Sequence, residues 1–426
     1  MKNTKLRLII LNFLEFAVWG AYLTSQGRYL ASAGMGSQIG WFYSIQGIVS
    51  IFMPALVGIL ADKWDARKML ALCHAITAVA MLGAGYYGMT AGADVQFGPL
   101  FALYTIAVAF FMPTIALTNS VAYTLLERDG YDTVKDFPPI RIWGTIGFII
   151  SMWAVDLLGF QPTAMQYVVS GGIGVVLAIY AFMLPACNTG ADAEAGKKSF
   201  VEALGLKAFT LFKDYKMALF FIFSFLLGAA LQISNGFANT YLGDFSGVDA
   251  YKGMFGVEHS NILISLSQVS ETFCILLIPF FLRKFGIKKV MLLAMVAWGF
   301  RFAFLGLGNP GGGVWLFLLS MIVYGVAFDF FNISGSLFVD KNTSMDIRSS
   351  AQGLFMLMTN GLGASVGSLA AQAVVNKYTA GLEGVEKMSG WTSAWLVFAA
   401  YAFVLAIVFA LTFKYKHNPE EMEKAA

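Results

Sequence analysis

The sequence contains little charge for its length. Only 12% of its 426 residues are Asp, Glu, Lys or Arg, 58% are apolar, and the mean hydropathy is +0.70. A soluble domain carries roughly twice that share of charged residues. The net charge of +3 is also too small to indicate a nucleic-acid partner. Because the apolar excess extends through the whole chain, the composition predicts an integral membrane protein.

Cysteine, histidine and common catalytic motifs are equally sparse. The three cysteines, Cys73, Cys187 and Cys274, are far apart and form no CxxC pair, and the three histidines are scattered. These patterns exclude a disulfide framework and indicate no metal site. The sequence has no GxxxxGK or HExxH motif, so nothing indicates ATP-driven transport or a membrane metalloprotease. We expect neither a cofactor nor enzymatic activity.

The apolar segments are long enough to cross a bilayer as helices. About 20 mostly apolar residues span about 30 Å of hydrocarbon. The N-terminal run resembles a signal peptide, but it is too long for a signal core and contains Glu15, so we expect it to be the first span. Twelve spans are predicted, at residues 8–30, 38–61, 69–90, 98–125, 139–160, 164–186, 217–243, 260–282, 289–308, 314–339, 349–376 and 390–413.

Lysine and arginine are distributed asymmetrically between the loops. If the N-terminus is placed in the cytoplasm, only four of the 28 basic residues fall on the outside, namely Arg28, Lys252, Lys377 and Lys387. Cytoplasmic loops of membrane proteins carry the excess of positive charge. We therefore expect both termini to be cytoplasmic.

A long polar loop separates two sets of six spans. Residues 200–212 within it alternate apolar and polar residues at helical spacing, which predicts a short helix on the membrane face. Two sets of six with a central linker are typical of transporters built from two repeats. We expect an N-terminal six-helix bundle at 1–186, a cytoplasmic linker at 187–216, a C-terminal six-helix bundle at 217–414 and a cytoplasmic tail at 415–426.

Five charged residues lie inside predicted spans: Glu15, Arg141, Glu271, Arg301 and Asp329. Each costs about 2.5–3.5 kcal/mol near the centre of a span, so such residues normally face a wet cavity or one another. Arg301 has aromatic neighbours and no polar ones in the sequence, and we interpret it as structural. For Glu15, a structural and a functional role remain equally open.

Helical spacing places polar and aromatic residues on shared faces of four spans. Together these faces predict a polar pocket with aromatic surfaces for stacking. Span five carries Arg141, Thr145 and Phe148; span seven carries Gln232, Asn235 and Asn239; span eight carries Gln268 and Glu271; span ten carries Tyr324, Phe328 and Asn332, with Asp329 beside them.

The residue types in this predicted pocket suit a neutral, partly flat substrate. Amide side chains both donate and accept hydrogen bonds, which matches hydroxyls and an amide-like ring edge. Aromatic side chains stack on a flat ring or cover the face of a sugar. A ribonucleoside has both parts, and a plain sugar would use the amides equally well, so both substrates remain open at this point.

Glu271 and Asp329 are the candidates for proton coupling. A carboxylate in a membrane cavity can bind and release a proton as its surroundings alternate. The alternative is a fixed ion pair with Arg141 or Arg301 that only holds helices together. His74 falls near the predicted cytoplasmic end of the third span and has no partner at helical spacing, so we interpret it as an ordinary interfacial histidine.

The loop GILADKWDARK (58–68) resembles the cytoplasmic signature of the major facilitator superfamily, Gly-x-x-x-Asp-Arg/Lys-x-Gly-x-Arg/Lys. Gly58, Asp62, Lys63 and Arg67 match, whereas Asp65 replaces the second glycine. Residues 283–289 resemble a degenerate copy. The resemblance implies an all-α membrane protein with the major facilitator fold, in which twelve helices form two pseudo-symmetric bundles. It also implies a gating loop, in which Asp62 caps a helix or pairs with basic groups.

A narrower resemblance extends over nearly the whole chain. The segments DFPPIRIWGTIGF (136–148), SQVSE (267–271) and FDFFNISGS (328–336) are similar to those of the nucleoside:proton symporter family. The resemblance implies proton-coupled uptake of nucleosides such as uridine, adenosine or cytidine across a bacterial inner membrane by alternating access. It implies a substrate site in a mid-membrane cavity between the two halves, and a functional role for Asp329. The implied substrate-binding residues are Arg141, Thr145, Phe148, Gln232, Asn235, Gln268, Glu271, Tyr324 and Phe328.

Two other functions remain open alongside this one. A symporter of the same fold for a sugar or oligosaccharide would use a similar pocket. A membrane sensor that binds a nucleoside without moving it would also match the residues. We expect a monomer in either case.

Overall fold

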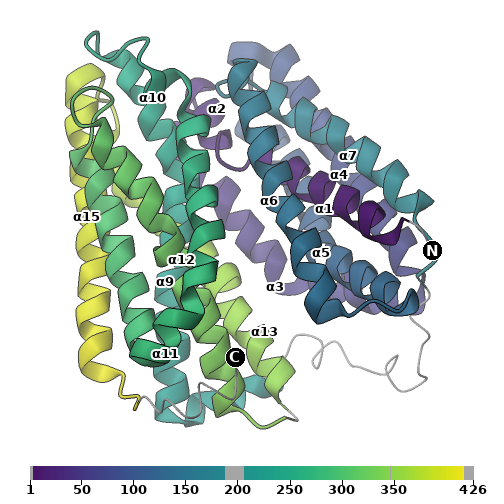
Figure 1. The fold of residues 1–426 in the computed structure, drawn as a ribbon. Helices are drawn as coiled ribbons and strands as arrows, with labels where there is room; N and C mark the ends of the chain where they lie inside the picture. The colour runs from purple at the N-terminus through teal and green to yellow at the C-terminus, as the bar shows by residue number, and fades with distance from the viewer. Residues whose placement is uncertain (1–2, 188–205, 346, 417–426) are drawn as a thin grey trace. The chain divides into compact units, whose positions relative to one another are not determined.

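The computed structural model describes residues 3–187, 206–345 and 347–416. In this part of the chain every regular element is helical, and no strand occurs. The chain divides into two compact units, Met1–Leu204 (unit 1) and Gly205–Ala426 (unit 2). Each unit is built around its own long apolar helices (Figure 1).

Unit 1 has its longest helices at the positions of predicted spans. Its described helices are α1 (Thr4–Gly20), α2 (Gln26–Ser32), η1 (Gly36–Gln38), α3 (Ile39–Lys63), α4 (Ala66–Ala91), η2 (Gly92–Asp94), α5 (Phe97–Arg128), α6 (Thr133–Leu157) and α7 (Met165–Met183). The closest helix pairs are α4 with α7 and α1 with α6.

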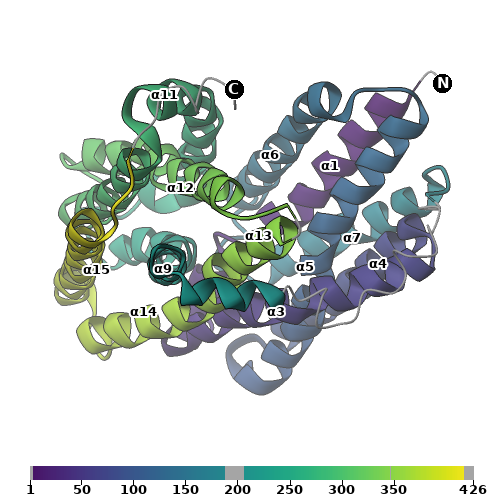
Figure 2. The same ribbon diagram turned by 90° about the horizontal axis from the view of Figure 1, so that it is seen from below.

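Unit 2 is also built from long helices packed against one another, and α9 is in close contact with α14 and α15 (Figure 2). Its described helices are η4 (Leu206–Lys213), α9 (Tyr215–Asp244), η5 (Phe245–Gly247), α10 (Phe255–Glu258), α11 (Ser260–Leu307), α12 (Val314–Asn342), α13 (Arg348–Met356), the π-helical turn η6 (Leu357–Gly363), α14 (Ala364–Thr379) and α15 (Gly384–Thr412).

Ten helical segments in the described residues are long and apolar enough to cross a membrane. One of them, α11, contains two of the predicted spans, because the backbone leaves the helical conformation at Gly286. The remaining predicted span corresponds to α1, which at 17 residues is slightly shorter than the others. The first predicted span therefore ends earlier than expected, and the turn at residues 21–25 leads into the separate short helix α2.

Two local features interrupt the regular backbone of helices in this fold. Gly286 adopts φ 76° and ψ 168°, in the region where residues with a Cβ are strained, so it separates the two halves of α11 with a sharp change of direction. Pro138 and Pro139 lie near the start of α6. They lie past the first turn, where each proline lacks the N–H that would donate to the residue four positions earlier, so the backbone hydrogen bonding of α6 is interrupted there.

Glycines allow the backbones of α1 and α6 to come into direct contact. A Cβ at Gly147 would collide with the carbonyl oxygen of Phe13, and a Cβ at Gly20 would collide with that of Phe148. Small residues at such contacts let helix backbones meet in the membrane. This close contact fixes the face of α6 that carries Arg141, Thr145 and Phe148 against the aromatic residues of α1.

Much of the predicted linker, residues 188–205, lies outside the described residues, so the expected helix at 200–212 can be followed only in its second part. There the chain forms η4, a 3₁₀ helix. Asp214 then caps α9, since its Oδ1 accepts a hydrogen bond of 2.9 Å from the backbone N–H of Met217. This cap sets the start of α9 two residues before the predicted span.

We predict that Gly147→Ala destabilises unit 1 by about 1–3 kcal/mol, because the added methyl group overpacks the α1–α6 contact. The measurement is thermal unfolding of the purified protein in detergent. Gly172→Ala on α7 is the matched control, since a Cβ there meets no atom within 4 Å. Equal melting temperatures for the two variants would contradict the close contact between α1 and α6.

Candidate functional site

The predicted substrate face of α6 lies against aromatic residues of α1. The guanidinium carbon of Arg141 is 3.9 Å from the centroid of the Phe16 ring. Phe148 meets Trp19 edge-on, with ring centroids 6.2 Å apart. Thr145 lies between them in the sequence stripe and is half-buried. In unit 1, the rings of Phe16 and Trp19 on α1 therefore pack against Arg141 and Phe148 of the predicted site.

In unit 2 the predicted aromatic stripe of α12 forms a stacked pair. The rings of Tyr324 and Phe328 are 5.7 Å apart and almost parallel, at 7°. Trp298 of α11 packs edge-on against Tyr324 at 5.9 Å. A ring that is held on two sides loses little further freedom when a flat ligand stacks on it, so this pair is suited to stacking.

Arg301 has the polar partners that its sequence neighbours did not suggest. Its guanidinium donates to the Ser234 hydroxyl through Nε and Nη2, at 3.0 and 2.7 Å, and to the Ser320 carbonyl oxygen at 2.8 Å. Nη1 also donates to the Ser267 hydroxyl at 3.2 Å. The guanidinium carbon lies 4.5 Å from the centroid of the Tyr324 ring. Arg301 thus holds α9, α11 and α12 together and supports a ring of the predicted site.

The two predicted proton-coupling carboxylates are close enough to interact electrostatically. Glu271 of α11 acts on Asp329 of α12, and both charges act on the Tyr324 hydroxyl. Asp329 is only 5% exposed, and its Oδ2 has no hydrogen-bond partner. A buried carboxylate oxygen without a donor is costly when ionised, so one of these groups is well placed to carry a proton.

Some amide side chains of the predicted polar faces have an oxygen free to accept a hydrogen bond, and others are already hydrogen-bonded within the protein. The side-chain oxygens of Gln232 and Gln268 are buried without a hydrogen-bond partner. Asn235 is half-buried. By contrast, Asn239 donates to the Asn261 side-chain oxygen at 2.7 Å, and Asn332 donates to the Phe328 carbonyl oxygen of its own helix at 2.9 Å. Asn239 therefore has a structural role between α9 and α11, and Asn332 has one within α12.

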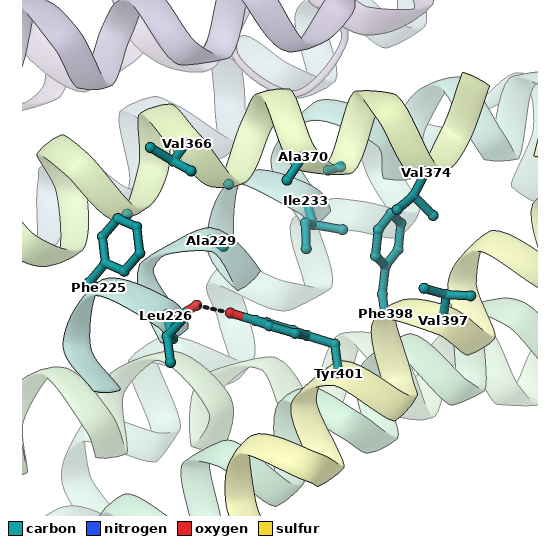
Figure 3. Close-up of a pocket in the computed structure, with 13 residues that line it drawn as sticks. Phe225, Leu226, Ala229, Ile233, Val366, Ala370, Val374, Val397, Phe398 and Tyr401 are labelled. Carbon is teal, nitrogen blue, oxygen red and sulfur yellow. Dashed lines mark hydrogen bonds between the residues drawn. The ribbon is translucent and has the colours of Figure 1, made fainter. Parts of the chain in front are cut away.

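An apolar cavity of about 270 Å³ lies between α9, α14 and α15 (Figure 3). The hydroxyl of Tyr401 is the polar side-chain group of its wall, and it donates to the Leu226 carbonyl oxygen at 2.6 Å. Because this wall offers no available polar group, the cavity is unsuited to recognising a nucleoside. A smaller hollow lies beside the predicted stacking ring of Phe328 and is also lined by Asn332 and Asn360.

The interpretation of His74 as an interfacial histidine is wrong. Its side chain is fully buried in unit 1, and Nε2 lies 2.7 Å from Oε2 of Glu15, which is also fully buried. The search for partners at helical spacing missed this pair because the two residues belong to different helices, α4 and α1. No signal within either helix indicates the contact.

The predicted gating loop is held by Asp65, the residue that replaces the usual glycine. Its Oδ1 caps α4 by accepting from the Arg67 backbone N–H at 3.0 Å, and its Oδ2 lies 3.0 Å from the Arg67 guanidinium. Arg67 also donates to the Leu184 carbonyl oxygen at 2.6 Å, after the end of α7. Gly58 and Asp62 lie on α3, and Lys63 is its last residue.

Cysteine and metal chemistry receive no support from the structure. The three cysteines are free and buried, and burial raises the pKa of the Cys187 thiol to about 11, which keeps it neutral. Among the residues that the structure describes, no group of three or more His, Cys, Asp or Glu side chains is placed to hold a metal ion.

Long apolar helices that bury ionisable, amide and aromatic side chains define a multi-pass membrane transporter. The chain belongs to the nucleoside H⁺ symporter family, whose model matches residues 1–418. It has the major facilitator fold and is a transporter, not an enzyme.

Two relatives from Escherichia coli strain K12 are similar over almost their full length. The nucleoside permease NupG is 46% identical over 419 residues, which cover 97% of each chain. The xanthosine permease is 45% identical over 425 residues, covering 99% of this chain and 98% of the relative. The crystal structure of the nucleoside transporter NupG matches with a TM-score of 0.87 at 45% identity, covering 97% of this chain and 100% of that one.

We predict that Ser234→Ala destabilises unit 2 by about 1.5–3 kcal/mol, the usual cost of losing a hydrogen bond to a charged group. The measurement is thermal unfolding in detergent. Ser224→Ala is the matched control on the same helix, because the Ser224 hydroxyl is also buried but bonds only to the Phe220 carbonyl oxygen of α9. Equal effects of the two substitutions would show that Arg301 does not depend on Ser234.

Proposed function

We propose that this protein takes up nucleosides together with protons across a bacterial inner membrane by alternating access. The observation that supports this proposal most directly is the set of stacked rings and unpaired amide oxygens in unit 2. Phe328 offers a half-buried aromatic ring that is stacked on Tyr324, while Gln232 and Gln268 have side-chain oxygens without partners. A nucleoside supplies a flat base and several hydrogen-bond donors, which match both features.

The residues proposed to recognise the nucleoside are those predicted from the sequence, taken for each unit by itself. Arg141, Thr145 and Phe148 act from α6, and Phe16 and Trp19 support two of them. Gln232, Asn235, Gln268, Glu271, Tyr324 and Phe328 act from unit 2. Accepted substrates are neutral nucleosides such as uridine, adenosine and cytidine. Relatives that are named a nucleoside permease and a xanthosine permease support the substrate class.

Glu271 and Asp329 carry the coupling proton in this proposal. Two interacting carboxylates in a low-dielectric setting resist being ionised together, so one of them binds a proton readily. Substrate binding beside Glu271 links the protonation to transport. The monomer is the functional unit, both termini are cytoplasmic, and the loop from Gly58 to Arg67 takes part in gating.

The experiment that tests the function is uridine uptake by the purified protein in proteoliposomes. An inward proton gradient of one pH unit should concentrate uridine about tenfold if one proton accompanies each nucleoside. A protonophore should abolish the accumulation, and excess adenosine should compete. Competition by a disaccharide without competition by adenosine would indicate a sugar transporter. Binding of uridine without any accumulation would indicate a sensor.

We predict that Glu271→Gln and Asp329→Asn each abolish gradient-driven uridine accumulation, because neither amide can bind the coupling proton. At least one of the two variants should keep exchange of labelled for unlabelled uridine, which requires no net proton movement. Asp249→Asn, at an exposed position between η5 and α10, is the control for loss of a carboxylate. Normal accumulation by both site variants would exclude these carboxylates as proton carriers.

A further inference from the structure

Glu15 of α1 is surrounded by polar groups from two other helices of unit 1. Thr114 and Thr118 of α5 donate hydrogen bonds to its Oε1 and Oε2, at 2.6 and 3.0 Å. His74 of α4 lies with its Nε2 2.7 Å from Oε2. All four side chains are at most 1% exposed. Every oxygen of this carboxyl group therefore has a partner, although it lies far from water.

The depth of this cluster sets it apart from an interfacial ion pair. Glu15 is eleven residues from the start of α1, which corresponds to about 16 Å along the helix axis, roughly half the hydrocarbon thickness. His74 is eight residues from the start of α4. An ionisable pair at such depth is a functional candidate by default, because membrane interiors rarely tolerate one.

The charge state of the pair follows from its burial. An ionised Glu15 beside a neutral His74 would leave one uncompensated charge in a low-dielectric environment, which is strongly unfavourable. Adding one proton, shared between Oε2 and Nε2, makes the pair neutral overall. A second proton would charge it again, and the Nδ1 atom of His74 is buried without a partner that could accept a hydrogen bond. The pair is therefore built to hold one proton.

Few other ionisable groups face this pair from the helices packed around α1. From α4 the neighbour is the buried Cys73 thiol, and from α5 the contacts are the two threonines. From α6 the charged residue is Arg141, whose guanidinium covers the ring of Phe16, the residue after Glu15. From α7, Tyr180 donates to the Arg7 carbonyl oxygen, about two turns towards the N-terminus.

We propose that Glu15 and His74 form a second proton-binding site, which takes up and releases one proton in each transport cycle. The site lies in unit 1, on residues other than Glu271 and Asp329. The inference rests on the proposed function, because it assigns a further proton to the same symport cycle. Release requires water to reach the pair, which a transporter achieves when it opens towards either side.

The test is the proton-to-uridine ratio of the full-length protein in proteoliposomes. Labelled uridine and an entrapped pH indicator report the two fluxes together. Glu15→Gln keeps the shape of the side chain and can still bond to the threonines, but it cannot hold the proton. It should lower the ratio by about one proton per uridine while uridine counterflow continues. His74→Gln should act in the same direction.

A second variant, Thr118→Val, separates proton binding by the pair from a purely structural role. Thr118→Val removes one hydrogen-bond donor to Oε2 of Glu15 but leaves both proton-binding groups in place, so it should change the pH dependence of uptake if the pair binds a coupled proton. The pH of half-maximal uptake should then shift while the proton-to-uridine ratio stays unchanged. Thr77→Val is the matched control, since it removes a buried hydrogen bond from α4 to the Ala107 carbonyl oxygen without touching the pair. It should leave both quantities unchanged.

The outcomes separate this proposal from the proposed function. A Glu15→Gln variant with the wild-type ratio and pH profile overturns the second proton site. If Glu15→Gln shows no counterflow because it fails to fold, an unchanged pH profile in Thr118→Val overturns the site as well. If the wild-type protein itself shows no uridine counterflow, the proposed nucleoside transport fails, independently of the two variants.

Discussion

A charge that is buried among membrane helices must find its partners inside the protein, because neither lipid nor water is there to solvate it. Arg301 meets this constraint in unit 2 with three serines from α9, α11 and α12. Glu15 meets it in unit 1 with His74 and two threonines. Each solution joins three helix segments, so the positions of the ionisable groups and the packing of the helices depend on each other.

The candidate nucleoside residues are supported by groups that do not themselves recognise a substrate. In unit 2, Arg301 lies under the Tyr324 ring and Trp298 packs against its edge. In unit 1, Phe16 and Trp19 lie behind Arg141 and Phe148, and glycines at the α1–α6 contact bring these residues together. A side chain that is held in this way recognises its ligand with little loss of freedom.

The two units therefore differ in how their buried ionisable groups are paired. In unit 2, Glu271 lies three residues after Gln268 on α11, and the amide oxygen of Gln268 is unpaired, which suits coupling of a proton to substrate binding. The carboxyl group of Glu15 in unit 1 has both oxygens paired with side chains of the protein itself. Membership of the nucleoside H⁺ symporter family gives both arrangements a common context, in which protons are carried with the substrate.

Hydrophobic length and helical period determined much of this protein from the sequence alone. They located the spans, the break near Gly286 and the shared faces of α6, α9, α11 and α12, because each of these features repeats within one continuous segment. The partners of Arg301 and His74 were decided only by tertiary structure. Their contacts come from other helices, and no period within one helix records which neighbour it meets. The same reason explains why Asn239 matched a polar stripe of α9 although its partner, Asn261, lies on α11.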